Sequence, residues 1–77
     1  MQGYYLECRS VTTAQRAARA LDRCGYPARV TRLPSGVAGG CGYAVRIRPH
    51  MASDARECLR REGIEVGRLI RLEVSGP

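Results

Sequence analysis

The sequence contains no lysine, phenylalanine or tryptophan, and it has a single histidine, His50. A hydrophobic core must therefore be built from Leu, Val, Ile, Ala and the four tyrosines. No stretch approaches the roughly 20 apolar residues that a transmembrane helix needs. The N-terminal residues also lack the basic and apolar segments of an export signal. We expect one cytoplasmic domain over residues 1–77, with its core at about 4–74.

Residues that bind metals or catalyse reactions are equally scarce. The four cysteines follow one another at intervals of 16 or 17 residues without a CxxC pair: Cys8, Cys24, Cys41 and Cys58. This spacing does not fit a zinc site, and without an export signal we expect no disulfide framework. No Ser-His-Asp set, acidic pair or phosphate-binding loop can be assembled. We therefore expect neither an enzyme nor a bound cofactor or metal.

The basic residues are thirteen arginines, which with seven acidic residues give a net charge of +6. Such a balance can attract nucleic acid, anionic lipid or acidic proteins. The arginines are spread along the chain rather than grouped, however, and this distribution favours an ordinary solvated surface.

Hydrophobic periodicity predicts alternating strands and helices. Four strands are expected at 4–8, 28–33, 43–48 and 67–74. Helices are expected at 11–24, capped by Ser10 and ended by Gly25, and from Pro49 to Gly63. The alternation predicts three sets of core-facing strand residues: Tyr4, Leu6 and Cys8; Tyr43, Val45 and Ile47; and Ile70, Leu72 and Val74.

The two halves of the chain resemble each other at an offset of 38 residues. Leu21 recurs as Leu59, Gly25 as Gly63 and Tyr5 as Tyr43. With the order β-α-β-β-α-β, this echo predicts an α+β fold of the ferredoxin-like, split βαβ type. Its four-stranded antiparallel sheet would carry both helices on one face. The other face would stay open, and two chains could pair through it.

The cysteines divide into two classes. Cys8, Cys24 and Cys58 fall on the inward faces of predicted elements, so we expect them to be buried and unpaired. Cys41 lies in the glycine-rich segment 34–42, between Gly40 and Gly42. Flanking glycines leave a sulfur uncovered and let backbone N–H groups approach it, which favours a thiolate. Arg46 and Arg48, and also Arg32, could add positive potential. The alternative is a small turn residue without a chemical role.

RNA binding is the rival function, because Gly42-Tyr43-Ala44-Val45 partly matches the RNP1 motif of RNA-recognition domains. That function requires Tyr43 and Val45 on the open face of the sheet. The opposite register would then bury Arg46 and Arg48, which costs several kcal/mol for each unpaired charge. We therefore do not expect nucleic-acid binding. A binding module for proteins, with a basic surface, remains an alternative.

Three stretches of the chain resemble one family. They are Tyr4-Tyr5-Leu6 leading through Ser10 to Cys24-Gly25-Tyr26-Pro27, then Gly40-Cys41-Gly42-Tyr43-Ala44-Val45-Arg46, and finally Glu62-Gly63-Ile64-Glu65-Val66. In these the chain is similar to the selenium/sulfur carrier protein-like family of small bacterial domains, over about residues 4–72. The segment Arg48-Pro49-His50-Met51-Ala52 is less acidic than the family pattern.

The resemblance implies a carrier that holds sulfur or selenium on Cys41 as a persulfide or selenopersulfide. It also implies two kinds of partner, a donor enzyme such as a cysteine desulfurase and an acceptor protein. Such a carrier needs one accessible, nucleophilic sulfur and no general base of its own.

Overall fold

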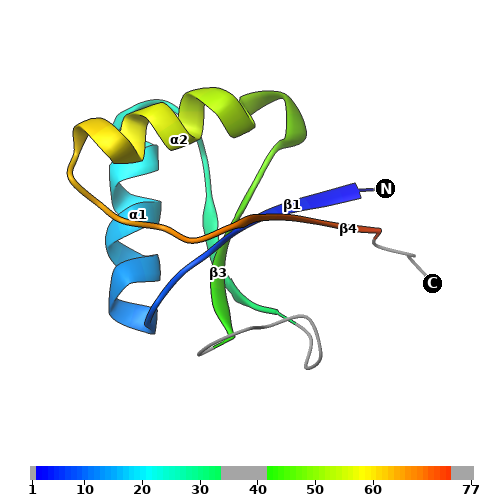
Figure 1. Ribbon diagram of the computed structural model, residues 1–77. Helices are drawn as coiled ribbons and strands as arrows, with labels where there is room; N and C mark the ends of the chain where they lie inside the picture. The colour runs from blue at the N-terminus through cyan, green and yellow to red at the C-terminus, as the bar shows by residue number, and fades with distance from the viewer. Residues whose placement is uncertain (1, 34–41, 74–77) are drawn as a thin grey trace.

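The computed structural model describes residues 2–33 and 42–73, which form strands and helices in the order β-α-β-β-α-β (Figure 1). A short 3-10 helix, η1, leads into the second α-helix. The elements are β1 (Gln2–Glu7), α1 (Val11–Arg23), β2 (Arg29–Arg32), β3 (Tyr43–Ile47), η1 (Pro49–Met51), α2 (Ala52–Arg61) and β4 (Leu69–Glu73).

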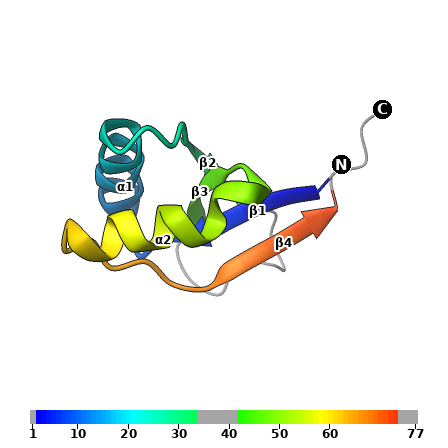
Figure 2. The same ribbon diagram turned by 90° about the horizontal axis from the view of Figure 1, so that it is seen from above.

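The four strands form one antiparallel sheet in the order β2-β3-β1-β4. Leu6 of β1 lies opposite Val45 of β3, and Tyr5 lies opposite Ile70 of β4. Both helices lie on the same side of this sheet (Figure 2). The ferredoxin-like split βαβ fold predicted from the sequence is thereby confirmed. Neither described helix is long and apolar enough to cross a membrane.

The two helices begin differently but end alike. The Ser10 hydroxyl accepts a hydrogen bond from the Thr13 backbone N–H at 3.2 Å, which satisfies one of the donors left over at a helix start. At the other end of α1, Gly25 has a φ of +85°, and Gly63 after α2 has a φ of +72°. These are left-handed conformations that glycine adopts at little cost, so the echoed glycines end both helices in the same way.

Replacing Ser10 with alanine should lower the free energy of unfolding by about 1 kcal/mol, because the Thr13 N–H loses its acceptor. Urea unfolding followed by circular dichroism would measure the change. Ser10→Asp is the matched control, since aspartate caps as well as serine and should keep the wild-type midpoint. Equal losses in both variants would contradict a capping role.

The main core lies between the helices and the sheet. Its fully buried side chains include Leu6, Leu21, Val45, Cys58 and Leu59. A second, smaller cluster lies on the other face of the sheet, where Tyr5, Leu33 and Ala44 are buried and Ile70 and Leu72 pack against them. The main core confirms the inward faces predicted for the first and third strands.

The predicted face of the last strand is wrong. Tyr5 lies on the face away from the helices and is the register partner of Ile70, so Ile70 and Leu72 belong to the second cluster. Leu69 packs against the main core instead. Val74 lies outside the described residues. A one-residue shift in a strand exchanges its two faces, and here Leu69, Ile70 and Leu72 are apolar on both sides, so alternation could not fix the register.

Identical residues 38 positions apart occupy equivalent places in the two helices but not in the strands. Leu21 and Leu59 are both buried in the main core. Tyr43 packs against that core, whereas Tyr5 lies on the opposite face. The identity of Tyr5 and Tyr43 therefore joins residues on opposite faces of the sheet, which are not structurally equivalent.

Candidate functional site

Backbone hydrogen bonds connect the start of β3 and the residue before it to the ends of β1 and β2. The Cys8 N–H, just after β1, donates to the Tyr43 carbonyl oxygen at 2.9 Å. The Leu33 N–H, just after β2, donates to the Gly42 carbonyl oxygen at 2.6 Å. Gly42 has a φ of +85°, a conformation that side chains rarely adopt. The residue that follows Cys41 in the chain is thus fixed where the ends of β1 and β2 meet the start of β3.

Gly40 and Cys41 lie outside the described residues, so their assignment to the site stays a prediction. Arg46 and Arg48 follow Tyr43 by three and five residues, which in an extended strand corresponds to about 10 and 17 Å. Arg32 lies closer to the strand start, because it is the register partner of Tyr43. Its guanidinium carbon is 5.2 Å from the centre of the Tyr43 ring, within cation–π range.

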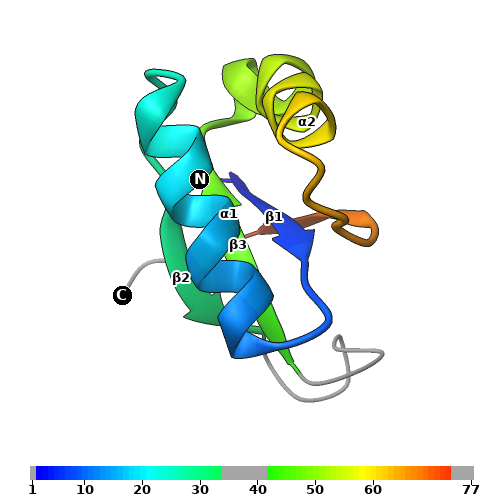
Figure 3. The same cartoon turned by 90° about the vertical axis from the view of Figure 1, so that its left-hand side faces the viewer.

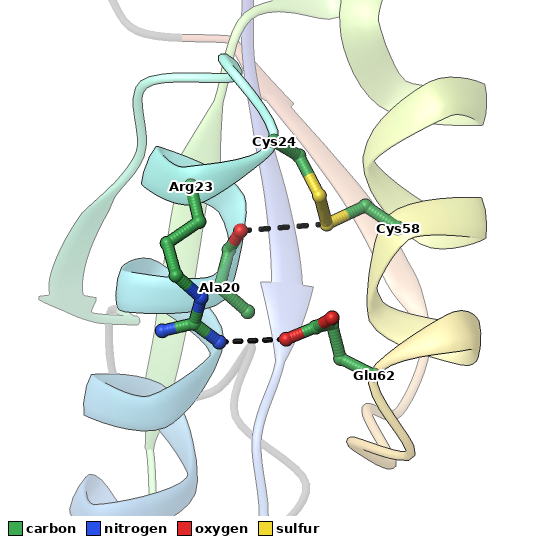
Figure 4. The surroundings of a disulfide bond; sticks show 5 residues. All are labelled: Ala20, Arg23, Cys24, Cys58 and Glu62. Carbon is green, nitrogen blue, oxygen red and sulfur yellow. Dashed lines mark hydrogen bonds and ion pairs between the residues drawn. A yellow bond between two sulfur atoms is a disulfide. The ribbon is translucent and has the colours of Figure 1, made fainter.

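Two of the other cysteines form a disulfide, Cys24–Cys58, between the C-cap of α1 and the inner face of α2 (Figure 4). Cys58 is fully buried, and Cys24 is half-buried beside the main core. The expectation that these two cysteines are unpaired is therefore wrong. The sequence correctly places Cys58 on the inward face of its helix, whereas Cys24 is the C-cap of α1 and only half-buried, and two helices on one side of the sheet bring the two residues together.

The surroundings of the disulfide tie the two helices together at several points. Arg23 donates to the Glu62 carboxylate at 2.6 Å across the same helix pair (Figure 4). Cys58 Sγ lies 3.5 Å from the Ala20 carbonyl oxygen. A disulfide sulfur has no proton, so this is a close contact in the oxidised protein, and it becomes a hydrogen bond only for the reduced thiol.

Cys8 is buried as predicted, with 3% of its surface exposed, and its Sγ lies 3.4 Å from the Leu6 carbonyl oxygen. It contributes to the main core on the helix side of β1. Both the burial and the position at the end of a central strand indicate a packing role for this side chain.

The positions of Tyr43 and Val45 argue against the RNA-binding alternative. Val45 is fully buried in the main core, and Tyr43 packs against the same core on the helix side. On the other face Tyr5 is only 9% exposed. A Cβ atom added at Gly3 would lie 2.7 Å from the Tyr5 hydroxyl oxygen, so that ring lies directly against the backbone. The described face offers no exposed aromatic ring on which bases could stack.

Comparison with known protein families identifies a family that this chain matches. The family model described as Putative Se/S carrier protein-like covers residues 3–71. No curated protein and no solved structure matches the chain. The match covers nearly all of both βαβ halves, including β1, β3 and the segment between them. The chain belongs to this Se/S carrier protein-like family.

Proposed function

We propose that the protein is a sulfur or selenium carrier rather than an enzyme, and that the Cys41 thiol holds the transferred atom. The family assignment is the observation that carries this proposal. A carrier in this sense accepts one atom from a donor protein and passes it to an acceptor protein. It needs a reactive thiol and surfaces that partners recognise, and no catalytic site of its own.

The distribution of the cysteines supports Cys41 as the carrier residue. Cys24 and Cys58 are bonded to each other, and a disulfide sulfur is not available as a thiolate nucleophile. Cys8 is buried in the main core, where a donor protein could not approach it. Cys41 is the cysteine that remains, and it precedes a glycine whose carbonyl is anchored at the strand ends.

The proposed exchange is a thiol–persulfide transfer. The Cys41 thiolate attacks the outer sulfur of a donor persulfide, and the sulfur–sulfur bond of the donor breaks. The donor cysteine leaves as a thiolate, and Cys41 now carries the outer sulfur as a persulfide. Attack by an acceptor thiolate on that outer sulfur repeats the exchange and regenerates the Cys41 thiolate. Selenium would follow the same steps as a selenopersulfide.

Loading of the protein with sulfur tests this function. After incubation with a cysteine desulfurase and cysteine, and removal of small molecules, the intact mass should rise by one sulfur atom. Cleavage after arginine places the four cysteines in separate peptides, namely 1–9, 24–29, 33–46 and 57–60. We expect the added sulfur on peptide 33–46. An unchanged mass would argue against a carrier, and added sulfur on peptide 1–9 would identify Cys8 as the site.

We also propose that the exchange takes place in the cytoplasm. Disulfides are rare in that compartment because glutathione and thioredoxin reduce them. The Cys24–Cys58 bond would then be exposed to reduction in the cell. Trapping thiols with an alkylating reagent during lysis would report the fraction of peptides 24–29 and 57–60 that is reduced. Complete oxidation of the pair in cells would point to an oxidising compartment instead.

A further inference from the structure

A groove of about 910 Å³ lies where β2 begins and β3 ends. Part of its lining is apolar and comes from Pro27, Ala28, Ile47 and Pro49. The rest is charged and comes from Asp22, Arg29, Arg46 and Arg48. Three of its four charged residues are therefore arginines. The groove is separate from the start of β3, since Arg46 lies near the other end of that strand and Arg48 just after it.

The arginines of this groove carry charges that nearby acids do not balance. Arg29 and Arg46 are register partners on adjacent strands, an arrangement of like charges that destabilises a sheet. In the described part of the chain, neither they nor Arg48 have a carboxylate within ion-pair distance, whereas Arg23, Arg60 and Arg68 each have one. Concentrated positive charge beside apolar surface fits an anionic ligand.

The shape of the groove favours an extended chain over a small molecule. All three arginines are exposed, whereas small-molecule sites bury most of the ligand surface. β2 is an edge strand of the described sheet, so one side of its backbone can accept a further strand. Guanidinium groups bind carboxylates through paired hydrogen bonds. Two copies of this chain would bring the same positive grooves together, which argues against a homodimer here.

We propose that this groove binds an acidic, extended segment of a partner protein. Carboxylates of the segment contact Arg29, Arg46 and Arg48, and an apolar side chain packs on the exposed Pro27 and Pro49. The inference does not depend on the carrier chemistry of Cys41. Binding at this end of β3 leaves the start of the strand, next to Cys41 in sequence, open for exchange with the same partner.

A labelled peptide that alternates glutamate with leucine tests the proposal, with a glutamine-for-glutamate peptide as its control. We expect saturable binding of the acidic peptide by fluorescence anisotropy. The triple variant Arg29→Gln/Arg46→Gln/Arg48→Gln should weaken it by about tenfold or more. The matched variant Arg16→Gln/Arg19→Gln/Arg56→Gln removes equal charge from exposed helix positions and should change it by less than about threefold. Arg46→Lys keeps the charge but loses the paired geometry, so we expect an intermediate effect.

Several outcomes would overturn the proposal. Equal losses in the two triple variants would mean that net charge alone attracts the peptide. Tighter binding of inorganic phosphate or an oligouridylate at the same arginines would assign the groove to another ligand. Absence of peptide binding to the wild-type protein would also contradict it. Circular dichroism melts of every variant separate loss of binding from loss of folding.

Discussion

Replacing Cys41 with serine should abolish sulfur loading and leave the fold intact. A serine hydroxyl does not form the thiolate that attacks a donor persulfide, so the exchange has no nucleophile. Cys41 belongs to the glycine-rich segment 34–42, where the sequence predicts a loop, and a substitution in a surface loop usually changes stability by no more than about 0.5 kcal/mol. Intact mass after the desulfurase reaction gives loading, and thermal unfolding gives stability.

The matched control for Cys41→Ser is the double variant Cys24→Ala/Cys58→Ala. It removes two cysteines and keeps Cys8 and Cys41, so it should still accept one sulfur at a temperature where it is folded. If Cys41→Ser accepts sulfur as readily as the wild type, another cysteine holds the cargo and the proposed function needs a different site. If only the double variant fails, the disulfide pair itself takes part in the exchange.

Reducing the Cys24–Cys58 disulfide should be the largest single change in stability. The bond joins residues 34 apart, and a loop of that size corresponds to about 4 kcal/mol of lost chain entropy in the unfolded state. For a domain this small, we expect the melting temperature to fall by about 15–30 °C. Thermal unfolding with and without a thiol reductant measures the shift.

The double variant Cys24→Ala/Cys58→Ala also serves as the control for this experiment. It should melt at a temperature near that of the reduced wild type or below it, because Cys58 also fills space in the main core. Adding reductant to the variant should have no further effect. Identical melting of oxidised and reduced wild type would show that the bond contributes nothing to stability.

The loss of stability on reduction matters for the proposed function. A carrier that works in a reducing compartment must stay folded with Cys24 and Cys58 as thiols. The reduced Cys58 thiol can donate to the Ala20 carbonyl oxygen, so its burial leaves no unsatisfied donor. The two helices would remain joined by the Arg23–Glu62 ion pair and by their packing on the sheet (Figure 3).

The order of the strands and helices, the ends of the helices and most of the main core could be predicted from the amino-acid sequence. These features depend on local chemistry: Ser10 caps a helix, Gly25 and Gly63 end helices, and the spacing of Ala14, Ala17 and Leu21 marks one face of α1. The alternation of Tyr43, Val45 and Ile47 with Ala44, Arg46 and Arg48 predicted the face of β3 that packs on the main core, and this face argues against the RNA-binding alternative. The family resemblance was also present in the residues themselves.

The register of β4, the pairing of Cys24 with Cys58 and the position of Arg29 opposite Arg46 could not be predicted from the sequence and are seen in the folded protein. Each depends on which residues of two separate elements lie opposite each other, and neither periodicity nor spacing along one element contains that information. Because Leu69, Ile70 and Leu72 are all apolar, the sequence is compatible with either face of the sheet for each of them. The pairing of Ile70 with Tyr5 of β1 fixes which face each one takes. The disulfide and the arginine groove likewise arise only when helices and strands distant in the chain come together.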